Sequence, residues 1–166
     1  MILESDLELE LQRSRANGLY ALLQSAAATH QLSFAFVLGV ASRETSIQNE
    51  LGDGGHGVGV LQIDIRYHEI ALQAKESGSW KTDPGPLIDY GAGMLASNVA
   101  WAKETFPQYG GENGQGWLKI AASAYNAGQI GAKTGVEAGD SDLHTTGKNY
   151  GKDVLQRMAI FEQLIG

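Results

Sequence analysis

The sequence predicts an α+β fold that is mainly helical, with one small antiparallel β-hairpin beside a helical core. Two observations support this prediction. Apolar residues recur at intervals of three and four through most of the 166 residues, which is typical of the buried faces of amphipathic helices. A stretch with five glycines, residues 52–64, interrupts this spacing and contains the apolar run from Val58 to Ile63, as expected of a hairpin.

Length and composition indicate one globular domain over residues 1–166, with 43% hydrophobic and 19% charged residues. The absence of cysteine excludes disulfides, thiolate metal sites and a cysteine nucleophile. A formal net charge of -7 argues against a nucleic-acid partner. No stretch reaches the roughly 18 to 20 apolar residues of a membrane span, and the acidic start lacks the layout of a signal peptide. We therefore expect no membrane insertion, and a monomer is the default expectation.

Three helices are expected in the first 46 residues. Ser5 and Glu8 fit a capping box for a helix that runs towards residue 15, although the alternating leucines at 7–11 also fit a strand. Helical spacing predicts a second helix over 19–30. Ser33 fits the N-cap position of a third helix, which carries Glu44.

Prolines and glycines divide the rest of the chain. The middle of 65–80 fits a short helix. Pro84 and Pro86 fit the start of a long helix, which Pro107 ends. The helix that begins at Trp117 is expected to stop at Gly128. After a loose stretch, 135–147, the final helix has an inward side formed by Val154, Met158, Phe161 and Ile165.

Glu44 ends an apolar stripe that includes Val37, Val40 and Ala41. An ordinary ion-paired glutamate at a helix end is the simplest interpretation. Adjacent helical residues point about 100° apart, however, so Arg43 does not share the face of Glu44 and is a poor partner for it. A carboxyl group without a cation in apolar surroundings keeps its proton to higher pH, as a general acid must.

The glycine-rich stretch carries two further carboxylates, Asp53 and Asp64. Each has a simple structural interpretation, as a turn residue and a strand-end residue. Glycoside hydrolysis with inversion needs a protonated acid and a second carboxylate that activates water, so a Glu facing this hairpin has the required groups. Its glycines match GxGxxG, but a helix precedes and a strand follows, which argues against phosphate binding. Asp53, His56 and Asp64 match no zinc or calcium template, and we expect no metal.

Three motifs occur in the order found in goose-type lysozymes, a family shared with soluble lytic transglycosylases. They are SRET at 42–45, GDGGHGVGVLQID at 52–64 and SAYNAG at 123–128. The chain resembles this family over residues 33–165, whereas residues 1–32 match less well. The resemblance implies a lysozyme-like fold with a small antiparallel sheet and a long cleft for a β-1,4-linked glycan of N-acetylmuramic acid and N-acetylglucosamine.

The resemblance also implies roles for individual residues. Glu44 corresponds to the general acid, and Asp53 and Asp64 correspond to the carboxylates that position or activate water. Five residues are expected to bind substrate or to shape its site: Gln62, His68, Tyr125, Asn126 and Tyr150. The implied chemistry needs no cofactor.

These expectations together describe a muramidase that hydrolyses peptidoglycan by inverting single displacement, with peptidoglycan glycan strands as its partner and the cell wall as its place of action. Alternatives are a lytic transglycosylase that gives 1,6-anhydromuramic products, a chitinase-like activity, and an inactive glycan-binding module. The acidic composition and missing cysteines are unlike the animal enzymes, so we expect a bacterial or phage origin.

Overall fold

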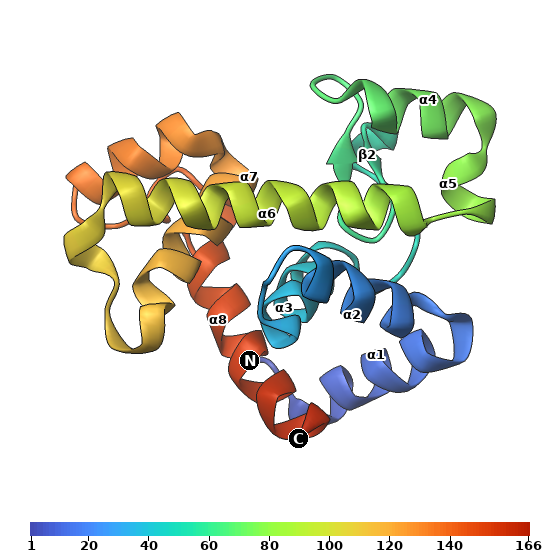
Figure 1. The fold of residues 1–166 in the computed structure, drawn as a ribbon, viewed down its shortest axis with the longest axis horizontal. Helices are drawn as coiled ribbons and strands as arrows, with labels where there is room; N and C mark the ends of the chain where they lie inside the picture. The colour runs from blue at the N-terminus through green and yellow to red at the C-terminus, as the bar shows by residue number, and fades with distance from the viewer.

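The computed structural model describes residues 1–166, and helix α3 (Phe34–Thr45) packs against helix α8 (Tyr150–Ile165) (Figure 1). The two helices approach closely because α3 has glycine at the crossing. A Cβ atom on Gly39 would lie 2.8 Å from the carbonyl oxygen of Val154, which is too close for a side chain. Ser33 caps α3 as predicted, since its side chain accepts a hydrogen bond from the amide of Phe36.

The first two helices, α1 (Glu4–Asn17) and α2 (Leu19–Thr29), form a hairpin around Gly18, whose φ is 85°. The predicted capping box is wrong, because α1 already begins at Glu4 and its N-cap, Leu3, makes no side-chain cap bond. The strand alternative for 7–11 is also wrong. Leu7 and Leu11 are buried on one helical face, one turn apart.

The glycine-rich stretch forms a three-stranded antiparallel sheet, one strand more than the predicted hairpin. Its strands are β1 (Leu51–Gly52), β2 (Gly57–Val58) and β3 (Ile63–Asp64), paired in chain order. Gly52 and Gly57 lie opposite each other, and the side chain of Gln62 fills the space above them. A Cβ atom on either glycine would collide with the Gln62 side-chain oxygen, so glycine at both positions makes room for this side chain.

Helices α4 (Glu69–Ser77) and α5 (Ser79–Thr82) lead into α6 (Gly85–Thr105), which runs across the molecule between α4 above and α2 below in the view of Figure 1. Pro86 lies in the first turn of α6 and Pro107 follows its end, as predicted. Two short 3₁₀ helices, η2 (Pro107–Tyr109) and η3 (Glu112–Gly114), connect α6 to α7.

Helix α7 (Gln115–Glu137) continues past the predicted stop, but its backbone breaks at Gly128, with φ 79° and ψ 162°. The prediction is therefore correct for the break and wrong for the end, since a second helical segment follows it. A short 3₁₀ helix, η4 (Thr146–Lys148), then precedes α8. The break places the end of the SAYNAG motif at a change of chain direction.

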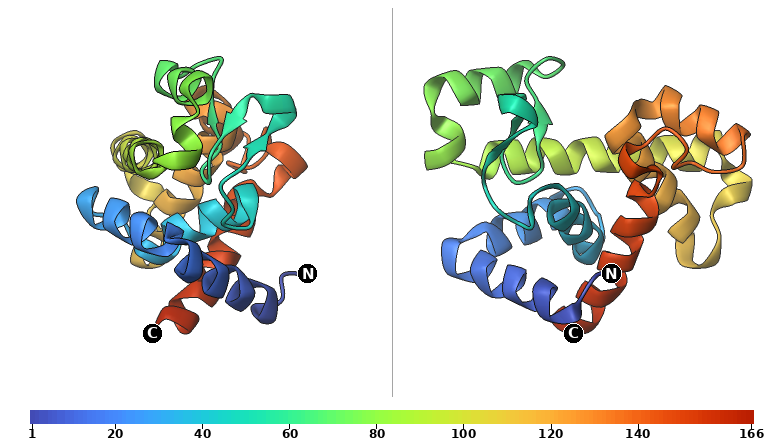
Figure 2. Two further views of the ribbon diagram at one scale, coloured as in Figure 1. Left: turned by 90° about the vertical axis from the view of Figure 1, so that its right-hand side faces the viewer. Right: turned by 180° about the vertical axis from the view of Figure 1, so that it is seen from behind.

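One cluster of 31 buried residues draws on helices from both ends of the chain and on the sheet. Leu7, Leu23 and Phe161 belong to it, so residues 1–32 pack into the same core as the rest. Both termini lie on the same side of the molecule, where α1 contacts α8 (Figure 2). None of the helices is long and apolar enough to cross a membrane.

Candidate active site

A cleft of about 890 Å³ lies among the sheet, the end of α3 and helices α6 and α7. All but one of the residues that the sequence singled out for the site line this cleft: Glu44, Asp53, Gln62, Asp64, His68, Tyr125 and Asn126. The exception is Tyr150, which is buried and contacts Glu44 from the side of α8. Segments far apart in the sequence therefore meet at one site.

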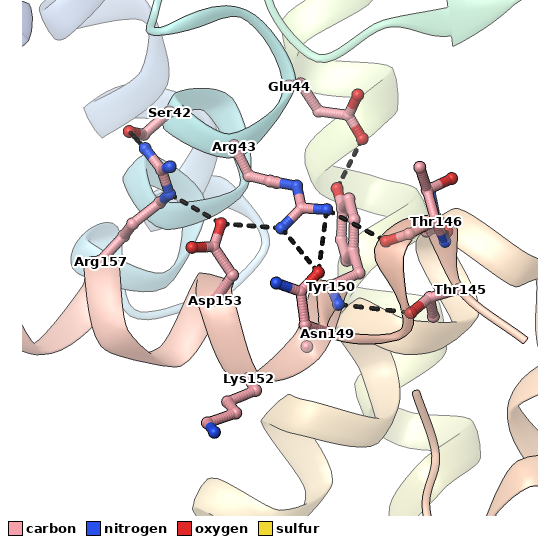
Figure 3. Close-up of polar contacts among 12 residues, drawn as sticks. Ser42, Arg43, Glu44, Thr145, Thr146, Asn149, Tyr150, Lys152, Asp153 and Arg157 are labelled. Atoms are coloured by element: carbon pink, nitrogen blue, oxygen red, sulfur yellow. Dashed lines mark hydrogen bonds and ion pairs between the residues drawn. The ribbon is translucent and has the colours of Figure 1, made fainter. Parts of the chain in front are cut away.

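Glu44 is half-buried at the last turn of α3, and the Tyr150 hydroxyl donates a hydrogen bond of 2.5 Å to its Oε1 atom (Figure 3). Burial raises the pKa of Glu44, while the Tyr150 hydrogen bond and the charge of Arg43 oppose that rise. Arg43 itself pairs with Asp153 at 3.0 Å, which confirms that its main partner is not Glu44. The raised pKa favours a carboxyl group that keeps its proton.

Two tyrosines surround this acid. Tyr125 donates a hydrogen bond of 2.5 Å to the carbonyl oxygen of Leu61, which ties α7 to the loop before β3. Burial and the nearby charge of Glu44 raise the pKa of both Tyr125 and Tyr150 well above its ordinary value. Both phenols therefore remain protonated and act as hydrogen-bond donors at neutral pH.

The two aspartates share one cation, Arg66, which the sequence analysis missed. Its side chain donates to both oxygens of Asp64, at 2.7 to 3.2 Å, and its Nη2 atom lies 3.0 Å from Oδ2 of Asp53. The Arg66 hydrogen bonds are the main cause of the lowered pKa of Asp64. The sequence does contain a sign of this contact, because Arg66 follows the strand-end residue Asp64 by two positions. A short turn at that spacing brings the guanidinium back to the carboxylate.

Gln62 lines the cleft, but its amide is engaged by the backbone. Its Nε2 atom donates to the carbonyl oxygens of Glu50 and Gly59, at 3.0 and 2.9 Å. The residue also has a positive φ of 53°, in the turn between β2 and β3. These contacts make Gln62 a brace for the sheet that carries Asp64.

His68 and Asn126 also line the cleft. The Nδ1 atom of His68 is 2.8 Å from the hydroxyl of Tyr90. Nε2 is the other nitrogen of the ring and does not take part in this contact. The side-chain oxygen of Asn126 accepts a hydrogen bond of 2.8 Å from the amide of Thr146. Asn126 thus fixes the segment that leads to Tyr150.

A mainly helical fold with a small antiparallel sheet, and a cleft that holds a half-buried acid near paired aspartates, defines the class of lysozyme-like proteins. The family model described as Lysozyme g matches residues 10–164. The chain therefore belongs to the Lysozyme g family, and its resemblance to goose-type lysozymes is confirmed.

Individual relatives agree with this assignment. Lysozyme g of Gallus gallus is 32% identical over 133 residues, which are 78% of this chain and 56% of that protein. Lysozyme g of Struthio camelus is 30% identical over 133 residues, which are 78% of this chain and 58% of the relative. Lysozyme g of Takifugu rubripes is 26% identical over 161 residues, which are 95% and 80% of the two chains.

The chain spans little more than half the length of the first two of these relatives. All three relatives come from vertebrates. The bacterial or phage origin expected from the missing cysteines stays a prediction.

Proposed function

We propose that this chain is a muramidase that hydrolyses the β-1,4 bond between N-acetylmuramic acid and N-acetylglucosamine in peptidoglycan. The proposal rests on one observation: two carboxyl groups in the same cleft have pKa values that are shifted in opposite directions. Burial raises the pKa of Glu44, whereas Arg66 lowers the pKa of Asp64. Two carboxyl groups whose pKa values are moved apart can serve as acid and anion at the same pH. Membership of the Lysozyme g family supports the same activity.

In the proposed reaction Glu44 gives its proton to the glycosidic oxygen as the bond from that oxygen to the anomeric carbon breaks. A water molecule attacks the anomeric carbon from the opposite face and loses a proton to a carboxylate, which inverts the configuration. The Tyr150 hydroxyl donates to the Glu44 carboxylate that forms. Because a hydrogen bond to the charged form stabilises it, this contact favours the proton transfer.

We assign the water to Asp53 rather than to Asp64. Both oxygens of Asp64 accept hydrogen bonds from Arg66, which makes this carboxylate a weak base. Arg66 contacts Asp53 through Oδ2 alone, and the Asp53 side chain is 67% exposed. Oδ1 of Asp53 therefore has room for a water molecule. In this assignment Asp64 stays ionised and holds the side chain of Arg66 in position, and Arg66 in turn holds Asp53.

The engagement of both aspartates by Arg66 also favours one alternative, a lytic transglycosylase. In that reaction the 6-hydroxyl of the substrate attacks in place of water, and the product is a 1,6-anhydromuramic sugar. That reaction needs no separate base, because Glu44 can perform both proton transfers in turn.

Mass spectrometry of the muropeptides released from purified peptidoglycan distinguishes the two reactions, because an anhydro product is lighter by one water. The proposal predicts reducing muramic ends. Anhydro ends would show that the reaction is transglycosylation and not hydrolysis. Release of sugars from chitin oligomers alone would show that the substrate is chitin and not peptidoglycan. Binding to cell walls without any released sugar would indicate a glycan-binding module.

A further inference from the structure

The side chain of Arg43 extends from α3 to the start of α8 (Figure 3), and Arg43 is not among the residues that line the cleft. Its Nη1 atom is 3.0 Å from Oδ2 of Asp153, and both terminal nitrogens donate to Oδ1 of Asn149 at 3.3 Å. Nη2 also donates to the carbonyl oxygen of Thr146 at 3.1 Å. One guanidinium therefore holds residues on both sides of Tyr150 in the sequence.

Arg43 also contacts Tyr150 itself. The Cζ atom of Arg43 lies 5.1 Å from the centre of the Tyr150 ring, within the range of a cation–π interaction. The Tyr150 backbone amide is fixed independently by a hydrogen bond to Thr145, at 3.3 Å. The ring is 2% exposed, and its hydroxyl ends at Glu44. The position of this hydroxyl thus depends on a ring that Arg43 holds on one face.

The polar contacts of Arg43 continue from Asp153 through further side chains to helix α1. Asp153 accepts a second ionic contact from Nε of Arg157 at 2.8 Å, and Arg157 donates to Oγ of Ser42 at 2.7 Å. Ser42 in turn donates to Glu10 of α1 at 2.6 Å. Asp153 therefore keeps one cationic partner when Arg43 is replaced. Since a buried anion without any partner is the usual cause of severe destabilisation, this arrangement allows an Arg43 variant to fold.

We propose that Arg43 is a positioning residue, which holds Tyr150 in hydrogen-bonding contact with Glu44 and touches no substrate itself. The role rests on the proposed function, because it matters for turnover only if Glu44 is the acid. A guanidinium suits this task better than an ammonium group. Its planar fork reaches Asp153, Asn149 and Thr146 at once, whereas lysine offers a single point charge.

The alternative is a purely structural clamp between α3 and α8. Such a clamp would act on Glu44 only through the charge of Arg43, and by the same amount with or without the Tyr150 hydroxyl. The titratable or charged groups that act on Glu44 are Tyr150 from α8, Tyr125 from α7 and Arg43 from its own helix. A change at Arg43 can therefore reach the acid directly through its charge or indirectly through Tyr150.

The pKa of Glu44 separates these routes without any need for turnover. It can be measured by carbon NMR of protein labelled with ¹³C-glutamate, in which the Glu44 signal is identified by its loss in Glu44→Gln. The titration is carried out on the wild type, Arg43→Met, Tyr150→Phe and the double variant. Arg15→Met is the matched control, because Arg15 stacks on Tyr20 at 4.6 Å in a different part of the molecule.

The proposal predicts that Arg43→Met and Tyr150→Phe each raise the pKa of Glu44, since each removes an interaction that favours the carboxylate. The two changes are expected to be non-additive: the rise caused by Arg43→Met should be smaller in the Tyr150→Phe background, where only the direct loss of the Arg43 charge remains. Arg15→Met leaves the pKa unchanged. A wild-type pKa in Arg43→Met, or an equal rise in both backgrounds, would overturn the proposal.

Turnover provides a second readout. Arg43→Met is expected to lower kcat by about 10-fold or more, because small displacements of catalytic groups are costly. Arg43→Lys should recover only part of that loss although it keeps the charge, and full recovery would overturn the geometric role. If the wild type releases no sugar, the proposed function fails, while the NMR titration still decides the role of Arg43.

Discussion

The hydroxyl oxygen of Tyr150 lies 2.5 Å from Oε1 of Glu44, and it joins residues that are 106 positions apart in the sequence. The Tyr150 hydroxyl is the donor, because burial and the charge of Glu44 raise its pKa well above the ordinary value. This hydrogen bond stabilises the ionised form of Glu44. It also limits the rise in pKa that burial causes.

Tyr150→Phe removes this hydrogen bond and keeps the ring. We expect kcat to fall by roughly 10- to 100-fold, because a hydrogen bond to a charged group contributes about 1.5 to 3 kcal/mol. The pKa of Glu44 should rise, so the alkaline limb of the pH–rate profile, where the acid loses its proton, moves to higher pH. Steady-state rates across pH test both effects. An unchanged alkaline limb would show that the hydroxyl does not act on Glu44.

Glu44→Gln should make the protein more stable at neutral pH. The folded-state pKa of Glu44 is raised above the unfolded value, so the charged form is disfavoured in the folded protein. The charged form of Glu44 therefore lowers the stability of the folded protein. This loss is absent when the pH is below the pKa of Glu44 in the unfolded chain, and it grows as the pH rises from that pKa towards the pKa in the folded protein. Thermal unfolding should therefore show a gain in Tm at pH 7 that vanishes under acidic conditions.

Glu104→Gln, at an exposed position of α6, is the matched control for this stability effect. A neutral amide there removes the same charge without relieving burial. If both variants raise Tm equally, the gain reflects net charge and not the environment of Glu44.

Asp53→Asn and Asp64→Asn should differ in their effects. Asp53→Asn removes the proposed base and should lower kcat by about 10²-fold with little change in stability. Asp64 has a lowered folded-state pKa, so its contribution to stability is present above the unfolded pKa and is lost as pH falls through the folded one. Asp64→Asn should therefore also reduce stability at neutral pH, by a small amount because its partner Arg66 is exposed to solvent.

Kinetics and urea unfolding of the two aspartate variants provide the comparison. Near wild-type kcat in Asp53→Asn would refute its assignment as the base. In that case the transglycosylase reaction, which does not need a separate base, becomes the better account.

Gly39→Ala should destabilise the fold by about 1 to 3 kcal/mol, because a Cβ atom there meets the backbone oxygen of Val154 at 2.8 Å. Gly85→Ala is the control, since its Cβ meets only ordinary contacts, the nearest at 3.6 Å. Urea unfolding of both variants measures the difference. Equal stability of the two would mean that α3 and α8 can separate at the crossing without cost.

The sequence predicts the parts of this molecule that depend on periodic patterns. The apolar stripe that leads to Glu44, the N-cap at Ser33 and the prolines that bound α6 all follow from local rules, and the structure confirms them. The second half of α7 was missed because the rule that glycine ends a helix does not tell whether another helix begins directly after it. At Gly128 the chain turns and helical bonding resumes.

Contacts between distant segments could not be predicted in the same way. Tyr150 entered the candidate site only through the family resemblance, because nothing in its local sequence indicates a contact with Glu44. Arg66 was missed although its contact with Asp64 is local. The ion pairs of Asp153 were missed because they depend on which helix faces cross, and that is set by packing such as the close approach at Gly39.

The central claim is that Glu44 is the acid of a peptidoglycan-cleaving enzyme. The most direct test is digestion of purified peptidoglycan by wild type and Glu44→Gln, with released muropeptides quantified by mass spectrometry. The amide keeps the shape of the side chain and the acceptor for Tyr150 but carries no transferable proton. We predict that release falls by about 10²-fold or more in the variant. Release at a rate close to wild type would contradict the account.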